Sequence, residues 1–367
     1  MILINDFKSE PADLRQAMLD AMTRVLDSGW YILGKEVEAF EREWAEACRT
    51  SHTVGVGNGL DAIEISLRTL GIGPGDEVIT TPITAIATVL AIVRAGATPV
   101  LADVDESAAL LSLDSVARCV TTKTRAVIPV HLYGQVRGAA ELQRFCSSHK
   151  LELVEDCAQA HLAEEAGEVA GSFSRIAAYS FYPTKNLGAL GDAGAIVTAE
   201  TSLAKRASRI RNYGQSVRYV HPELGVNSRL DELQAAILRA RLKWLPEFTA
   251  RRRRIARRYF DELSNPLITL LSEPLEPSSH VYHLFVIRCA RREALQRHLE
   301  VQAIQSLVHY PIPVHHQEPF RQIARDPKGL RTSEQHASSC LSIPCNPQMS
   351  DDDVTAVVAA INSFDID

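Results

Sequence analysis

TVGVGNGLDAIEISLRTL, residues 53–70, decides the fold of this chain. Thr53–Val56 is a short apolar run of the kind that forms a strand, a glycine-rich turn follows, and Gly59–Leu70 has the apolar spacing of a helix. The same order recurs downstream. It predicts strands at Glu77–Thr80, Thr98–Ala102, Ala126–Val130, Glu152–Glu155, Ile176–Ser180 and Ala195–Thr198, and helices at Ala85–Ala95, Leu113–Val120 and Gly138–His149. Such alternation indicates an α/β fold, with a mainly parallel sheet covered by helices on both faces.

The segments on either side of this alternation differ from it. Helices are predicted at Ala12–Leu26 and Glu36–Ala47, and Leu230–Leu263 is a long helical stretch that Pro246 interrupts. Further on, the pattern predicts a strand at Tyr282–Arg288 and a helix at Arg291–Glu300. We therefore expect N-terminal helices and a large α/β domain in residues 1–250. Residues 251–367 should hold a long-helix connection and a small α+β domain.

Composition and charge exclude several classes of protein. Of the 367 residues, 46% are hydrophobic and the net charge is −6, which argues against a dedicated nucleic-acid binder because such proteins carry a basic excess. The seven cysteines are scattered and have no CxxC spacing, which favours a reducing compartment over disulfides or a zinc site. The N-terminus has no signal-peptide pattern, and the longest apolar stretch, Ile83–Val93, is too short to cross a membrane. We expect a cytoplasmic protein without a membrane segment.

Ligands of open α/β sheets bind beyond the carboxyl ends of the strands. We therefore expect the binding site in the segments that follow predicted strands. Gly55–Asp61 follows a strand and opens a helix. Free backbone N–H groups and the helix dipole would make a phosphate cradle there. The alternative is a plain turn in which Asn58 or Asp61 caps the helix.

Two carboxylates, Glu155 and Asp156, end another predicted strand. Buried there, they need a cationic partner, which could be a protonated pyridine nitrogen, a metal ion or a structural arginine. The sequence shows no second ligand cluster at metal spacing, so we expect no metal site. Cys157 has no paired base and is interpreted as a packed residue, and His161 as a structural histidine.

Lys185 stands alone in a neutral, glycine-rich loop after a strand, within Ser180–Gly188. A lone lysine is usually solvated, but burial would lower its pKa and favour the free amine that Schiff-base chemistry requires. A phosphate cradle, an aspartate at a strand end and such a lysine are together what pyridoxal 5'-phosphate needs.

Eight motifs, in order, carry a resemblance that covers essentially the whole chain. They are YILG (31–34), GNGLDA (57–62), GPGDEV (73–78), VEDCAQAH (154–161), SFYPTK (180–185), GDAG (191–194), GVNSRLD (225–231) and HYP (309–311). With them the chain resembles the pyridoxal-phosphate-dependent sugar aminotransferases of the DegT/DnrJ/StrS type. The resemblance implies the type I, aspartate-aminotransferase-like fold and a homodimer with shared active sites.

The resemblance also implies a role for each matching residue. Lys185 would form the aldimine and shuttle the proton, and Asp156 would pair with the pyridinium nitrogen. The other cofactor contacts implied are Gln159 to the ring hydroxyl, Gly59, Leu60, Asp61 and Ser180 to the phosphate, and Asn227 to the partner's phosphate. The substrate site would include Tyr31, Arg229, His309 and Tyr310. An ion pair of Arg229 with Asp231 or Glu232 is the alternative to that role.

One position departs from the family pattern. Members of the family usually place an aromatic residue on the outer face of the pyridine ring, and here Ala85 occupies that position. Alanine cannot stack on a ring. Ile83, another residue or the substrate would have to cover the ring, and cofactor affinity would fall.

The lysine at position 185 separates the chain from the dehydratase branch of the family, which has histidine there. The resemblance therefore implies transamination, from L-glutamate through pyridoxamine 5'-phosphate to a keto sugar. GVNSRLD favours the branch that acts at C3 of a nucleoside-diphosphate-linked 3-keto sugar. Cations for the diphosphate would come from Arg211, Arg218 and Arg229, or from the cluster Arg251–Arg258, which otherwise is a solvated face.

Two other functions stay open. One is an aminotransferase for a 4-keto sugar or an aminocyclitol precursor. The other is a non-catalytic, cofactor-binding regulator, which only the arginine cluster supports.

Overall fold

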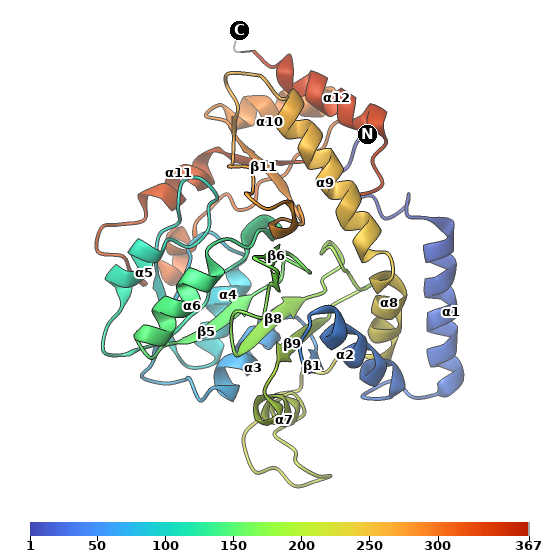
Figure 1. The fold of residues 1–367 in the computed structure, drawn as a ribbon, viewed down its shortest axis with the longest axis vertical. Coiled ribbons are helices and arrows are strands. Elements are labelled where there is room, and N and C mark those ends of the chain that lie inside the picture. Colours follow the sequence, from blue (N-terminus) through green and yellow to red (C-terminus); the bar gives the residue numbers. More distant parts are fainter. Residues whose placement is uncertain (366–367) are drawn as a thin grey trace.

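The computed structural model describes residues 1–365. A sheet of eight strands forms its centre, in the order β1-β9-β8-β5-β4-β2-β3-β12 (Figure 1). The strands are β1 (His52–Val56), β2 (Glu77–Thr80), β3 (Thr98–Leu101), β4 (Thr124–Val127), β5 (Glu152–Asp156), β8 (Ile176–Ser180), β9 (Gly194–Thr198) and β12 (Ala324–Arg325). Only β9 pairs antiparallel, with β1 and β8, so the prediction of a mainly parallel α/β sheet is confirmed.

Twelve α-helices are found in residues 1–365, and each helix predicted from the sequence is among them. They are α1 (Ala12–Ser28), α2 (Lys35–Ala47), α3 (Gly59–Thr69), α4 (Ile86–Arg94), α5 (Leu113–Cys119), α6 (Ala139–Ser148), α7 (Thr201–Ile210), α8 (Glu232–Leu242), α9 (Leu245–Glu262), α10 (Arg292–Val301), α11 (Arg331–Ser339) and α12 (Asp351–Asn362). The predicted interruption at Pro246 is confirmed, because α8 ends at Leu242 and Pro246 lies in the first turn of α9.

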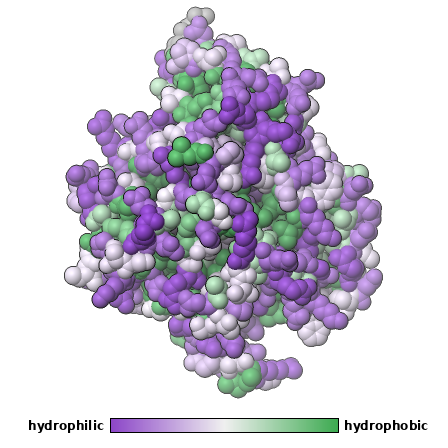
Figure 2. Space-filling model, viewed as in Figure 1, coloured by the Kyte–Doolittle hydropathy of each residue, from purple (hydrophilic) through white to green (hydrophobic). Residues whose placement is uncertain are grey.

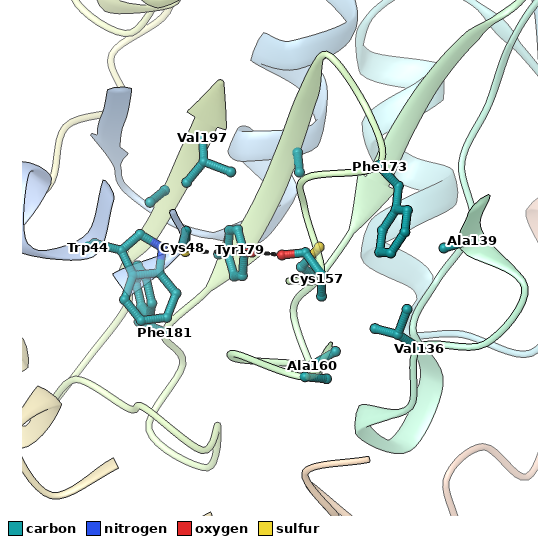
Figure 3. Close-up of a cluster of buried hydrophobic side chains, with 14 of the residues drawn as sticks. Trp44, Cys48, Val136, Ala139, Cys157, Ala160, Phe173, Tyr179, Phe181 and Val197 are labelled. Atoms are coloured by element: carbon teal, nitrogen blue, oxygen red, sulfur yellow. Dashed lines mark hydrogen bonds between the residues drawn. The ribbon is translucent and has the colours of Figure 1, made fainter. Parts of the chain in front are cut away.

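Helices cover both faces of the large sheet. Successive residues of a strand point to opposite faces, so Val78 belongs to the core cluster that includes side chains of α3, α4 and α7. Ile79 belongs to the cluster on the other face, which includes side chains of α2, α5, α6 and α8. On the second face Trp44 of α2 lies edge-on to Tyr179 and Phe181, with ring centroids 5.2 Å away in both cases (Figure 3). Cys157 is buried in the same cluster, and burial raises the pKa of its thiol well above 9, as expected of a packed residue.

A second, smaller sheet lies at the end of the molecule that also holds both chain termini (Figure 1). It is antiparallel and consists of β10 (Thr269–Leu270), β11 (Phe285–Arg288) and β13 (Cys340–Ile343), and a short hairpin, β6 (Glu164–Glu165) with β7 (Glu168–Val169), stands apart. Side chains of α9, α10 and α12 pack against the small sheet. The predicted domain boundary between residues 250 and 251 falls within α9, and the division itself stays a prediction.

Several bounds differ from the prediction. The expected strand 126–130 is shifted to β4, because Pro129 has no N–H for a sheet. The expected strand 282–288 begins three residues late, at Phe285, since Tyr282 adopts a positive φ of 45°. No helix in residues 1–365 has both the length and the apolar character needed to cross a membrane.

Candidate functional site

Three of the expected segments meet at one edge of the large sheet. Asp156 ends β5, and Ser180 ends the neighbouring parallel strand β8. The turn after β1 reaches the same edge across β9, whose first residue, Gly194, pairs with Val56 and Ser180. A Cβ on Gly194 would lie 2.4 Å from the carbonyl carbon of Asn58, so this close approach requires glycine.

The start of α3 offers free N–H groups. Asn58 caps the helix, since its side chain accepts a hydrogen bond from Asp61 N–H at 2.8 Å. The N–H groups of Gly59 and Leu60 have no acceptor among the described residues. A Cβ on Gly59 would lie 2.6 Å from Cβ of Ser180, so the hydroxyl of Ser180 lies beside these donors. The capping interpretation is therefore confirmed, and two N–H groups remain that can bind a phosphate.

Asp61 takes part in the cradle differently from the two residues before it. Its N–H is already used by Asn58, its Oδ2 accepts from the hydroxyl of Ser228 at 2.6 Å, and its Oδ1 pairs with Arg94 at 3.1 Å. Ser228 Oγ also accepts from Gly57 N–H at 2.9 Å. Asp61 thus ties segment 225–231 to the start of α3 and shapes the cradle without a free donor of its own.

The two neighbouring carboxylates point to opposite sides of the sheet and have different partners. Glu155 is fully buried and lies 2.9 Å from Nε2 of His131, and it also accepts from Gly171 N–H and the hydroxyl of Ser174. Its hydrogen-bond partner is thus the imidazole of His131, not the arginine considered from the sequence. Asp156 accepts hydrogen bonds from the hydroxyl of Thr88 at 2.8 Å and from Ala158 N–H at 3.1 Å, and it has no ion pair in residues 1–365.

Burial determines the electrostatics of Asp156 and Lys185. The pKa of Asp156 is raised by burial, although the hydrogen bonds from Thr88 and Ala158 and the charge of Lys185 oppose the rise. Burial lowers the pKa of Lys185 to about 8, against the attraction of Asp156. Nζ of Lys185 has no hydrogen bond or ion pair within the described chain. The site therefore holds an amine whose pKa is lowered to about 8 and a buried carboxylate that lacks a salt-bridge partner.

The loop that carries Lys185 is held at both ends by His161. Leu187 N–H donates to Nδ1 of His161 at 3.0 Å, which leaves Nε2–H to donate to the carbonyl of Ser180 at 3.0 Å. Burial lowers the pKa of His161 to about 3, so the ring is neutral and structural, as expected. Phe181, packed against Trp44, fixes the start of the loop in the core (Figure 3).

Gln159 and the two expected substrate residues of the HYP motif lie together. Nε2 of Gln159 donates to the hydroxyl of Tyr310 at 3.3 Å, and its Oε1 accepts from Tyr133 N–H at 2.8 Å. Nδ1 of His309 lies 2.8 Å from the hydroxyl of Ser342. Burial lowers the pKa of His309 to about 4 and raises that of Tyr310 to about 12, so both side chains are neutral hydrogen-bonding groups at pH 7.

Ala85 precedes α4, one turn before Thr88, and is partly exposed. Ile83, considered as an alternative cover for the ring, is 0% exposed because it packs in a core cluster with Val130 and Tyr133. A side chain without accessible surface cannot lie against a ligand, so this alternative is wrong.

Of the arginines in segment 211–231 that were expected to bind the diphosphate, Arg229 remains available and Arg211 does not. Arg229 pairs with neither Asp231 nor Glu232; it donates to Oδ1 of Asn212 at 3.3 Å and lies over the ring of Tyr213. Glu232 instead accepts from the N–H groups that open α2. Arg211 is buried, pairs with Glu41 and donates to the carbonyl of Gly55, so it cannot meet a diphosphate. Arg229 keeps a partly exposed guanidinium.

The arginine cluster 251–258 is only partly a solvated face, because Arg254 and Arg257 are exposed and the other four arginines are not. Arg252 is buried and donates to the carbonyls of Tyr282 and Cys345, and Arg253 donates to those of Ser278 and His280. Three others pair with acids: Arg251 with Asp351, Arg257 with Asp261 and Glu273, and Arg258 with Glu262. The cluster therefore joins α9 to the small sheet and α12.

The remaining expected residues have other partners within the described residues, and none forms a hydrogen bond or ion pair with Lys185 there. The exposed Asn227 forms a bridge with Asn212, and the carbonyl of the exposed Tyr31 accepts from Glu232 N–H. Arg218 is exposed over the ring of Tyr219. Sequence reasoning missed Thr88 and Tyr133. A hydroxyl in the otherwise apolar helix α4, and the HLYG segment after β4, are the signals that could have found them.

Comparisons with known proteins find relatives along almost the whole chain. The model of the DegT/DnrJ/EryC1/StrS aminotransferase family matches residues 12–362. The dTDP-3-amino-3,6-dideoxy-alpha-D-galactopyranose transaminase of Aneurinibacillus thermoaerophilus is 44% identical and covers 99% of both chains. The erythromycin biosynthesis sensory transduction protein EryC1 of Saccharopolyspora erythraea is 43% identical over 98% of both. The crystal structure of S. venezuelae DesV in complex with a ketimine intermediate superimposes with a TM-score of 0.95, at 42% identity, and covers 98% of this chain and 97% of that one.

Proposed function

Because this chain belongs to the DegT/DnrJ/EryC1/StrS aminotransferase family, and is thus a pyridoxal-phosphate-dependent aminotransferase, we propose that it transfers an amino group from L-glutamate to a nucleoside-diphosphate-linked 3-keto sugar. One observation carries the proposal: Lys185 has a pKa of about 8 and no hydrogen-bond partner, and Asp156 is a buried carboxylate without a salt bridge within the described residues.

The residues present fit the cofactor. A Cβ at Gly59 would fill the space beside Ser180, and the N–H groups of Gly59 and Leu60 remain free for a phosphate. Asp156 can hold a positive charge on a ring nitrogen, and an N–H of Gln159 can contact a ring hydroxyl. When bound, pyridoxal 5'-phosphate supplies a carbonyl carbon that takes up amines and a ring that withdraws electrons.

The chain's own residues perform the proton transfers. Nζ of Lys185 is free of competing bonds, so it can attach the cofactor at rest and then accept and return a proton at the substrate carbon. Asp156 would hold a positive charge on a bound ring, because burial keeps water away from its carboxylate. Arg229 offers a cation for the donor carboxylate or the sugar diphosphate.

The substrate at C3 is supported by the relative from A. thermoaerophilus, whose name specifies a dTDP-3-amino sugar. L-Glutamate is proposed as the donor because it is the amine source that the family resemblance implies. Seven free, buried cysteines support a reducing compartment, and we assign the protein to the cytoplasm.

We also propose that two copies form a homodimer with shared sites. The loop after α7 projects beyond the body of the molecule (Figure 1), and its tip carries apolar surface among hydrophilic neighbours (Figure 2). The exposed apolar residues there are Val217, Tyr219, Val220 and Leu224. Such a tip favours burial against a second copy, and Asn227, at the base of the loop, would then reach the partner's phosphate.

A regulator is the second candidate, because one relative at 43% identity carries the name of a sensory transduction protein. The arginine cluster gives it little support, since five of its six arginines bind carbonyls or carboxylates of this chain. A 4-keto sugar or an aminocyclitol precursor is the alternative substrate.

The absorption spectrum with L-glutamate tests the proposal. We expect a visible band of bound cofactor that bleaches with stoichiometric 2-oxoglutarate, and no such band in Lys185→Ala. The bleached protein should then regain its band with a nucleotide-linked 3-keto sugar and not with the 4-keto isomer or a free sugar. A band that L-glutamate leaves unchanged would mean another donor or another reaction.

A further inference from the structure

We propose that Tyr133 is a positioning residue, which holds Gln159 and the His309–Tyr310 segment in one fixed arrangement. The inference rests on the proposed function, in which Gln159 faces the cofactor and His309–Tyr310 faces the sugar. Tyr133 lies in η1 (Leu132–Gly134), beyond the carboxyl end of β4 and beside β5. It has a positive φ of 61°, which is uncommon for a residue with a side chain, and it is 1% exposed.

The main chain of Tyr133 determines how the amide of Gln159 is oriented. Tyr133 N–H donates to Oε1 of Gln159 at 2.8 Å. Because Oε1 is used as the acceptor, the Nε2 end must face the other way, where it donates to the hydroxyl of Tyr310 at 3.3 Å. One N–H of Nε2 remains for a ligand. The amide therefore presents a donor to the cofactor pocket.

The side chain of Tyr133 holds the substrate segment. Its hydroxyl lies 2.6 Å from the carbonyl of His309 and 2.7 Å from Nε2 of His336 on α11. A carbonyl can only accept, so the single hydroxyl hydrogen goes to His309 and the hydroxyl must accept from Nε2–H of His336. This assignment requires a neutral His336 with its hydrogen on Nε2. Burial lowers the pKa of His336 to about 4, so the ring is neutral at pH 7.

These contacts form a closed circuit. It runs from Tyr133 N–H through Gln159 to the hydroxyl of Tyr310, along the chain to the carbonyl of His309, and back to the hydroxyl of Tyr133. A displacement of the HYP segment therefore changes the second partner of Gln159. One residue that contacts neither ligand thus couples the sugar side of the site to the cofactor side.

Tyr133→Phe removes the hydroxyl alone, and Tyr259→Phe is its matched control. Tyr259 is also 0% exposed and donates to a backbone carbonyl, that of Pro344, at 2.6 Å, but it lies in the core of the small sheet. Tyr259→Phe loses one buried hydrogen bond and Tyr133→Phe loses two, so both melting temperatures should fall, that of Tyr133→Phe by more. Only Tyr133→Phe should change substrate binding and the spectrum of the bound cofactor.

We expect Tyr133→Phe to raise the KM for the keto sugar about tenfold, the effect of one lost buried hydrogen bond, with little change in the rate of the L-glutamate half-reaction. The pH at which the visible band of bound pyridoxal phosphate titrates should also shift in Tyr133→Phe and stay in place in Tyr259→Phe. Equal kinetic and spectral behaviour of the two variants would overturn the proposal, as would an equal loss of both half-reactions in Tyr133→Phe.

Should Tyr133→Phe not fold, His336→Leu replaces it, because it removes the N–H that orients the Tyr133 hydroxyl and leaves Tyr133 in place. The same shift of band and KM is expected, and their absence would count against the proposal. The test also separates the proposed function from the proposed role of Tyr133. A wild-type protein that uses no keto sugar refutes the proposed function, whereas the band titration of the variants still decides the role of Tyr133.

Discussion

The hydroxyl of Thr88 donates to Oδ2 of Asp156 at 2.8 Å and so joins the first turn of α4 to the end of β5. This bond keeps the pKa of a buried carboxylate lower than burial alone would set it. Oδ1 accepts from Ala158 N–H, so each oxygen of this carboxylate accepts one hydrogen bond.

Thr88→Val should therefore weaken the enzyme without unfolding it. The loss of the hydroxyl raises the pKa of Asp156 further, so the acidic limb of the pH profile of kcat/KM should move to higher pH. We expect kcat/KM at pH 7 to fall about tenfold. Thr88→Ser keeps the hydroxyl and should retain the wild-type profile, and an unshifted limb in Thr88→Val would show that the bond does not tune Asp156.

The pKa of Lys185 predicts how the apoenzyme takes up its cofactor. With a pKa of about 8, half of the amine is free at pH 8 and about one tenth at pH 7. The rate at which the visible band appears after pyridoxal phosphate is added should rise with pH up to about 8 and then level off. A rate that keeps rising to pH 10 would indicate an ordinary, solvated lysine.

Ala85→Tyr should tighten cofactor binding. An aromatic pair contributes about 0.5–1.5 kcal/mol beyond its buried area, so we expect the Kd of pyridoxal phosphate to fall by a factor of about 2–12. Equilibrium dialysis of the apoenzyme measures this directly. An unchanged Kd would mean that another group already covers the ring face.

Gly59→Ala should disrupt the phosphate cradle. The new Cβ would lie 2.6 Å from Cβ of Ser180, so either α3 or β8 must shift. We expect the Kd of pyridoxal phosphate to rise at least about tenfold. The double variant Gly59→Ala/Ser180→Gly relieves the clash and should recover the melting temperature but not the affinity, because it lacks the hydroxyl. Recovery of both would exclude a role for Ser180.

Acid should destabilise the fold through buried, neutral histidines. Burial lowers the pKa of His161 and His280 to about 3, of His309 and His336 to about 4, and of His283 well below 6.5. In the unfolded chain these groups titrate near 6.5, so their contribution is complete above that pH and is lost as the pH falls. The free energy of unfolding, from urea titrations, should fall by roughly 1.4 kcal/mol per pH unit for each neutral histidine between pH 6 and pH 5. A free energy of unfolding that stays constant between pH 6 and pH 5 would contradict this prediction.

Much of the fold could be predicted from periodicity, and the failures have physical reasons. The seven strands predicted for the large sheet and the break at Pro246 follow from apolar runs and from proline chemistry. The edge strand β12 has only two exposed residues, Ala324–Arg325, and owes its existence to pairing with β3, which no local pattern indicates. α7 was missed although its buried residues Leu203, Ala204, Ala207 and Ile210 have helical spacing.

The site was predictable where one residue's chemistry is unusual for its surroundings. Lys185 in an apolar loop and Asp156 at a strand end stand out in the sequence. The partners of a residue do not: that Glu155 meets His131, or that Arg211 pairs with Glu41, depends on contacts between distant segments. Likewise the arginine run of α9 suggested a charged surface, yet Arg252 is buried and donates hydrogen bonds to three backbone carbonyls.

One continuous helix belongs to two cores. Leu245, at the start of α9, packs under the large sheet, whereas Ile255 and Tyr259 pack under the small one. A rotation of the small sheet relative to the large sheet would have to bend this helix and break its internal hydrogen bonds. Cooperativity follows from this arrangement: the two cores should melt in a single transition, and substrates should reach Lys185 through movement of loops, with the two sheets fixed relative to each other.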